Sequence, residues 1–210
     1  MTRITTVIAA LVFFANPGFG SQARSSQWSR FDGHWWTEQS ADEHMAFIVG
    51  FYSCYTWDLK KTLRLTWKTY QLDSMVNRYL ERDTARVALP LWKVLPRIFR
   101  AAGPSPWENE RGAEPDPKGR YFEQDGAFWG EYTSEEVAGT MGKGYVEGYL
   151  VCNEFLLHGR RGRYSRSPAE YVALIKGWYG WDKTHREYRV PGGGDVPVPD
   201  VLFKFRDSVR

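Results

Sequence analysis

The chain has 210 residues, of which 42% are hydrophobic and 16% are aromatic. This composition is typical of a globular protein with a large apolar core and excludes an intrinsically disordered chain. The formal net charge of +3 arises from 28 basic and 25 acidic residues, a balance that argues against a nucleic-acid or membrane-surface footprint.

Residues 1–23 have the pattern of a secretory signal peptide. Arg3 supplies a short basic region, residues 4–15 form an apolar run, and residues 21–23 resemble a signal peptidase site. A helix that spans a bilayer needs about 20 apolar residues, and no segment is apolar over that length. We therefore expect a cleaved leader, a periplasmic or secreted protein, and no transmembrane segment after cleavage.

Residues 24–36 are predicted to form an extended lead-in with a turn at Asp32-Gly33. A long helix is predicted to follow over residues 40–60. Ser40 and Glu43 have capping-box spacing, in which the hydroxyl accepts from the amide of the third helical residue and the carboxylate accepts from the cap amide. Apolar side chains then recur at helical spacing and give the helix one broad apolar face.

Two shorter helices complete the first half of the chain. Residues 73–82 have a helical apolar pattern, and residues 87–100 predict another helix, with Pro90 near its start and Pro96 kinking or ending it. Residues 101–124 are rich in proline and glycine and show little apolar periodicity, which is typical of a linker.

The second half follows the same order. A long helix is predicted over residues 133–158, a shorter one capped by Ser167 over residues 167–181, and a proline-led helix over residues 196–205. Alternation typical of a strand is found only in residues 183–190.

The beginnings of the two long helices share a local code. Residues 36–43 match residues 129–136 in a Trp-x-Glu start and a capping box, at a shift of 93 residues. Further on, residues 47–54 match residues 145–152 at a shift of 98 residues. The second copy then carries extra residues between the cap and the shared glycine.

An ungapped alignment is the alternative, and it nearly superposes Gly50 and Cys54 on Gly144 and Gly148. Under either alignment, small residues recur four apart on one helix face, which lets two helix backbones approach closely. We predict an all-α fold of two similar three-helix repeats packed into one helical domain. Its parts are residues 24–100, the linker 101–124 and residues 125–210.

Cys54 and Cys152 are the only cysteines of the chain. Export implies an oxidising compartment, in which a disulfide persists. If the shift of 98 residues is right, the two cysteines occupy equivalent positions, and a pseudo-two-fold axis can bring them together. A disulfide and two buried free thiols remain alternatives, because spacing does not supply the geometry that a disulfide requires.

Motifs of known catalytic or metal-binding chemistry are missing from the sequence. The four histidines form no HExxH and the cysteines no CxxC, so we expect no metal site and no cofactor. A nucleophile elbow and a phosphate-binding loop are also absent. His44 and His158 lie near opposite ends of their predicted helices, and we expect them at the surface or in helix caps.

An enzymatic alternative rests on Glu38 and Glu131, which are equivalent at the shift of 93 residues. If a pseudo-two-fold axis relates the halves, the two carboxylates could face one another and act as acid and base on a glycosidic bond. The simpler interpretation is that both acids lie near the starts of the long helices without a catalytic role.

The strongest run of charge is the loop of residues 160–166, RRGRYSR. It joins two predicted helices, so a solvated loop is the simpler interpretation. The functional interpretation is that its arginines bind an anionic glycan, a lipid headgroup or an acidic protein face. The candidate binding residues are Arg160, Arg161, Arg163 and Arg166.

The signal peptide, the Trp-led capped helices, the Gly-Phe and Gly-Tyr pairs at residues 50 and 148, and the proline-led last helix resemble the Rap1a/Tai family. The resemblance implies small periplasmic helical units, in tandem here, of a kind that includes immunity proteins against type VI secretion effectors. The chain differs from that pattern in its long linker and its lack of further cysteines, and no effector-binding residue carries over.

Two functions follow from these observations. The first is an exported, non-enzymatic binding or inhibitor protein, immunity-like, with a protein partner in the cell envelope. The second is a cell-envelope glycan hydrolase that uses Glu38 and Glu131. The absence of catalytic motifs favours the first.

Overall fold

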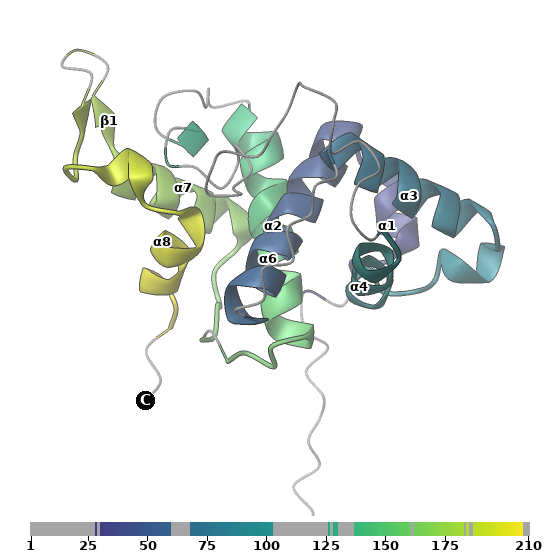
Figure 1. Ribbon diagram of the computed structural model, residues 1–210. Coiled ribbons are helices and arrows are strands. Elements are labelled where there is room, and N and C mark those ends of the chain that lie inside the picture. Colours follow the sequence, from purple (N-terminus) through teal and green to yellow (C-terminus); the bar gives the residue numbers. More distant parts are fainter. Residues whose placement is uncertain are drawn as a thin grey trace, which may run out of the picture.

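Figure 1 shows the computed structural model, which describes residues 28, 30–59, 68–102, 126, 128–129, 137–160, 162–182, 184 and 187–207. The predicted leader, residues 1–23, lies outside these residues. The described chain is mostly helical, as predicted, and carries one small two-stranded sheet. None of the described helices combines the length and the apolar character that crossing a bilayer requires.

The predicted extended lead-in is wrong from residue 33 onward. Helix α1 (Gly33–Glu38) begins there, and the Asp32 side chain caps it by accepting from the Trp35 amide at 3.0 Å. An Asp-Gly pair fits both a turn and a helix N-terminus, because the aspartate side chain accepts from nearby backbone amides in either case.

Helix α2 (Ala41–Leu59) confirms the predicted capping box. The Glu43 amide donates to Ser40 Oγ at 3.3 Å, and the Ser40 amide donates to the Glu43 carboxylate at 3.1 Å. Two orphan amides at the helix start are therefore satisfied by side chains.

Three elements complete the first half of the described chain. They are α3 (Thr69–Glu81), the 3-10 turn η1 (Thr84–Arg86) and α4 (Leu91–Ala102). Pro96 lies inside α4, which continues beyond it, so it does not end the helix. Helix α4 also includes the first two residues of the predicted linker, and residues 103–124 lie outside the described part.

The described part of the second half contains a π-helical turn, three α-helices, a short hairpin and a 3-10 turn. Ser167 caps α7 as predicted, because its hydroxyl accepts from the Glu170 amide. The strand prediction at residues 183–190 is confirmed in part, since the hairpin begins two residues earlier. The elements are η4 (Ala138–Gly142), α6 (Lys143–Phe155), α7 (Pro168–Tyr179), β1 (Trp181–Asp182), β2 (Glu187–Tyr188), η5 (Gly193–Asp195) and α8 (Val198–Lys204).

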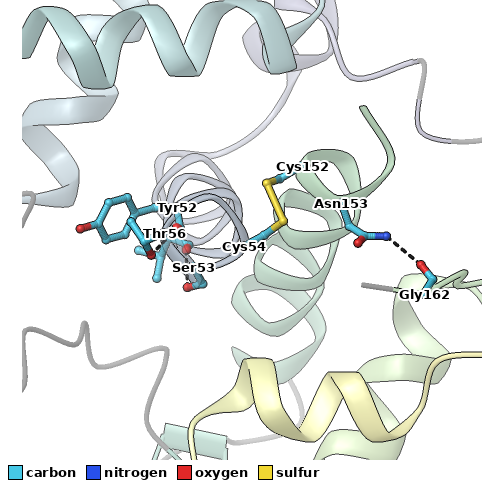
Figure 2. Close-up of a disulfide and its surroundings, with 8 residues drawn as sticks. Tyr52, Ser53, Cys54, Thr56, Cys152, Asn153 and Gly162 are labelled. Atoms are coloured by element: carbon cyan, nitrogen blue, oxygen red, sulfur yellow. Dashed lines mark hydrogen bonds between the residues drawn. A yellow bond between two sulfur atoms is a disulfide. The ribbon is translucent and has the colours of Figure 1, made fainter. Parts of the chain in front are cut away.

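Helices α2 and α6 cross at the centre of the molecule (Figure 1). A Cβ atom on Gly50 would overlap the Tyr145 carbonyl, and one on Gly148 would overlap the Phe47 carbonyl. Each helix thus uses a glycine to let the backbone of the other approach. The Cys54–Cys152 disulfide joins the same pair of helices, with the Cα atoms 6.1 Å apart (Figure 2).

The remaining helices lie on either side of this central pair (Figure 1). Helices α3 and α4 lie on the side of α1, and helices α7 and α8 lie on the side of the hairpin. Helix α3 contacts α2 and α4, whereas α7 contacts α6 and α8. One cluster of buried apolar side chains, rich in aromatic rings, runs through both sides. The description of the halves as repeats of one unit stays a prediction.

Candidate ligand groove on helix α7

The outer face of α7 forms the floor of an open groove with a volume of about 630 Å³. Helix α7 buries Tyr171 and Ile175 in the core, whereas Leu174 and Trp178 are only half-buried and line the groove. Phe205, which follows α8, adds a further aromatic side chain to the lining. The floor is therefore largely apolar.

The groove is open because two small residues lie one turn apart on α7. Ala173 and Gly177 are both exposed and both line the groove. A Cβ atom on Gly177 would find no heavy atom within 4 Å. Glycine in a helix costs about 1 kcal/mol relative to alanine, and here it leaves space at the surface rather than permitting a close helix contact.

Cationic side chains surround the apolar floor. Arg166 and Arg189 are exposed and line the groove, and a guanidinium of Arg189 donates to the Gly177 carbonyl at 3.4 Å. The ammonium of Lys204 lies 5.4 Å from the Trp178 ring centroid, a cation–π distance. These groups suit an anionic ligand with an apolar body.

Among the described residues of the groove lining, Glu170 is the one acidic side chain. Its carboxylate accepts from the Ser167 hydroxyl at 2.7 Å and from the Ser167 amide at 2.8 Å. These bonds lower the pKa of Glu170 below its ordinary value, and the bond from the Ser167 hydroxyl has the larger effect. The carboxylate thus remains ionised and is held by the cap of α7.

Of the three predicted binding arginines that the structure describes, one lines this groove. Arg166 does so, whereas Arg160 and Arg163 are exposed outside its lining, and Arg161 lies outside the described residues. The loop is anchored rather than free. The Asp207 amide donates to the Arg163 carbonyl at 2.8 Å, and Asn153 donates to the Gly162 carbonyl at 3.0 Å (Figure 2).

The predicted binding residues do not include Arg189, Phe205, Leu174 or Trp178. A signal for the last two was present, because an apolar face that spans residues 171, 174, 175 and 178 is wider than one buried contact requires. No local pattern marks Arg189, which the hairpin brings beside α7 by pairing Trp181 with Tyr188.

The catalytic pair of Glu38 and Glu131 stays a prediction, because Glu131 lies outside the described residues. Glu38 is exposed and ends α1. The buried carboxylate of the described chain belongs instead to Glu147 of α6, whose Oε1 lies 3.4 Å from Arg30 and 3.9 Å from Lys143.

The ionisation of Glu147 reflects a competition between burial and neighbouring charge. Burial raises its pKa above the ordinary value and dominates, while Lys143 and Arg30 lower it and Glu43 raises it. The carboxylate lies where α6 crosses α2, among side chains of the core. It is one acid between two cations, which is an ion cluster rather than an acid–base pair.

His44 is predicted at the surface or in a helix cap, and the surface position is wrong. Its side chain is buried, and its ring stacks on Trp36 with centroids 3.9 Å apart. Nε2 donates to the Trp36 carbonyl at 2.6 Å, and Nδ1 pairs with Asp73 at 2.9 Å. His44 therefore joins α1, α2 and α3. His158 is exposed, as expected.

Within the described ranges, no group of three or more His, Cys, Asp or Glu side chains has an arrangement that could hold a metal ion. Comparison with protein-family models, with curated proteins and with solved structures finds no match. The resemblance to the Rap1a/Tai family therefore stays a prediction from the sequence motifs.

Proposed function

We propose that this protein is an exported, non-enzymatic binding protein that docks a segment of a protein partner in the α7 groove. The observation that carries the proposal is the pairing of an apolar floor with a cationic rim. Leu174 and Trp178 form the floor, and Arg166 and Arg189 form the rim. The partner segment is apolar on one side and acidic at its flanks.

The shape of the groove supports a protein segment rather than a small metabolite. It is open along the outer face of α7, whereas small-molecule sites enclose most of the ligand surface. A half-buried tryptophan and two arginines are residue types that carry binding energy at protein interfaces. Because the rim charges are exposed, they mainly accelerate association and select acidic partners.

An exported location and an inhibitory role complete the proposal. The sequence pattern of residues 1–23 supports export, and a disulfide between Cys54 and Cys152 persists in an oxidising compartment. The Rap1a/Tai resemblance suggests that the partner is a toxin active in the cell envelope, which this protein neutralises by binding.

Site-specific photocrosslinking in the source cell tests the proposal. A benzophenone amino acid replaces Gly177 in the full chain, where it has room, and Gly139 in a control. Gly139 is also an exposed helical glycine, and a Cβ atom added to it would find no heavy atom within 4 Å. We expect one protein to crosslink from position 177 and not from position 139.

Charge reversal tests the role of the rim. The variant R166E/R189E should bind the crosslinked protein at least about tenfold more weakly, a change of about 1.4 kcal/mol. The matched control R160E/R163E reverses two exposed charges of the neighbouring loop outside the groove lining. Equal losses in both variants, or crosslinking from both positions, would show that the groove is not the docking site.

A further inference from the structure

A second groove is lined by residues of helices α3 and α4, which lie on the other side of the central helices from α7 (Figure 1). Its volume is about 390 Å³. Met75 and Tyr79 are half-buried side chains of α3 in its lining, and Ile98 of α4 lies beside them. Two exposed arginines, Arg78 and Arg82, also line it.

Several residues of this second groove, chiefly apolar ones, stand at the same helical positions as residues of the α7 groove. The amide of Lys68 donates to Gln71 at the start of α3, and the amide of Ser167 donates to Glu170 at the start of α7. These caps align α3 with α7 at a shift of 99 residues.

This shift matches both the core and the groove faces of the two helices. Buried Leu72, Val76 and Leu80 then correspond to buried Tyr171, Ile175 and Tyr179. On the groove side, Met75 corresponds to Leu174 and Tyr79 to Trp178.

Helices α4 and α8 correspond in the same way. The Lys93 amide donates to the Pro90 carbonyl, and the Asp200 amide donates to the Pro197 carbonyl. These first turns define a shift of 107 residues, at which Ile98 falls on Phe205. Both of these residues line their respective grooves.

A cation accompanies the aromatic residue of each groove at matching positions. Arg97 donates to the Tyr79 hydroxyl at 3.1 Å, and Lys204, its counterpart at the shift of 107 residues, lies over the Trp178 ring. A second cation, Arg86, lies 4.5 Å from the Tyr79 ring centroid. An aromatic ring, an aliphatic side chain and several cations thus recur in both places.

The packing around the central helices is reciprocal as well. Helix α4 contacts α6, and helix α8 contacts α2. Gly50 packs against Tyr145, which lies three residues before Gly148. In the same way, Gly148 packs against Phe47, which lies three residues before Gly50. Such reciprocity is the signature of a two-fold relation between the two sides of a structure.

We propose that the chain is bivalent, with two quasi-equivalent grooves that dock two copies of the same acidic, apolar-faced segment. The inference rests on the proposed function, since it takes the α7 groove to be a docking site. Because the grooves lie on opposite sides of α2 and α6, one short segment cannot fill both. One chain therefore holds two partner molecules, or both halves of a two-fold symmetric partner.

Charge complementarity selects this occupant. Among the described residues, the lining of the second groove contains Arg78 and Arg82 and no acidic side chain. The one described acid of the α7 groove is held in the helix cap. A basic or uncharged segment would leave these cations unpaired, whereas an acidic segment pairs with them.

The test uses a synthetic amphipathic peptide of leucine, alanine and glutamate as the probe, with an analogue that carries lysine for glutamate. Isothermal titration of the full chain measures the stoichiometry. We expect two acidic peptides per chain and no binding of the basic analogue. Gly177→Leu fills the α7 groove, and R78E/R82E reverses the charge of the second groove. Each of these variants should bind one peptide, and the variant that combines them should bind none. Gly139→Leu, the matched control, should still bind two.

The outcomes separate this inference from the proposed function. One peptide per chain, lost in Gly177→Leu and retained in R78E/R82E, would overturn bivalence and leave the α7 groove as the docking site. No peptide binding, together with a crosslinked partner at position 177, would overturn the shared acidic segment alone. No peptide and no crosslink would overturn both. Thermal unfolding of each variant verifies that loss of binding is not loss of fold.

Discussion

The α carbon of Gly50 lies directly against the carbonyl group of Tyr145, so that α2 and α6 touch through their backbones. Tyr145 and Phe47, the two residues beneath the glycines, are fully buried. The contact leaves no space for a side chain at residue 50 or 148. The rest of the fold is arranged around this crossing, because α3 packs on α2 and α7 packs on α6.

Substitution of either crossing glycine should therefore separate the central helices. We expect Gly50→Ala and Gly148→Ala each to lower the free energy of unfolding by about 3 kcal/mol or more, since the methyl group meets backbone that cannot rotate away. Chemical denaturation measures the loss. The control Gly139→Ala, where the methyl group meets nothing, should be neutral or stabilise by up to about 1 kcal/mol. Equal effects in all three variants would contradict a close backbone contact.

The disulfide joins the same two helices, and it should stabilise the folded protein because it lowers the entropy of the unfolded chain. Cys54 and Cys152 are separated by 98 residues, and closing a loop of that length is worth about 4–5 kcal/mol by the chain-entropy argument. The variant C54A/C152A should lose stability on that order in denaturant. Reductant should lower the stability of the wild type and leave the variant unchanged. Two reactive thiols in the unfolded, unreduced wild type would refute the bond.

Much of the helical fold could be predicted because its signals are local. Ser40 with Glu43 and Ser167 with Glu170 satisfy helix amides a few residues away, so the sequence alone contains both partners of each bond. The same locality explains the error at α1. An aspartate side chain such as that of Asp32 accepts from nearby backbone amides both in turns and in helix caps, so the local sequence does not distinguish the two.

The groove could not be predicted because its parts meet only after folding. Arg166 precedes α7, Arg189 follows the hairpin and Phe205 follows α8. Trp178 has the spacing of a core residue, and its half-exposed position depends on how far α8 reaches over α7. The pairing of Cys54 with Cys152 likewise depends on where α2 crosses α6, which spacing does not determine.

A buried polar network at the junction of α1, α2 and α3 offers a further test. Trp36 Nε1 donates to Asn77 Oδ1 at 2.7 Å, and Asn77 donates in turn to Asp73, the partner of His44. Asn77→Ala should cost about 1–3 kcal/mol of unfolding free energy, because it leaves the buried Trp36 indole without this acceptor.

The control for this network is Ser74→Ala on the same helix. Among the described residues, the Ser74 hydroxyl bonds only to the Tyr70 carbonyl of its own helix, at 2.9 Å. Its removal should therefore change the stability by less than about 0.5 kcal/mol. If Asn77→Ala is equally mild in denaturation experiments, water has replaced the amide and the network does not stabilise the junction.

Glu147 should make the stability depend on pH in a direction opposite to that of most carboxylates. Burial raises its pKa in the folded protein, so the folded chain binds this proton more tightly than the unfolded chain. The associated stability is present at acidic pH and is lost as the pH rises from the ordinary pKa through the raised one, by roughly 1.4 kcal/mol for each unit of difference. Glu147→Gln removes this loss, because the amide does not ionise.

We therefore expect the free energy of unfolding of Glu147→Gln to gain on that of the wild type as the pH rises from acidic to neutral. The side chains of Arg30 and Lys143 are 62% and 42% exposed in the folded protein, so neither becomes an unpaired buried charge in the variant. Glu154→Gln changes an exposed acid of the same helix and should follow the wild type at every pH. If the wild type instead gains on Glu147→Gln toward neutral pH, attraction to the two cations outweighs burial, and the cluster is a stabilising ion pair.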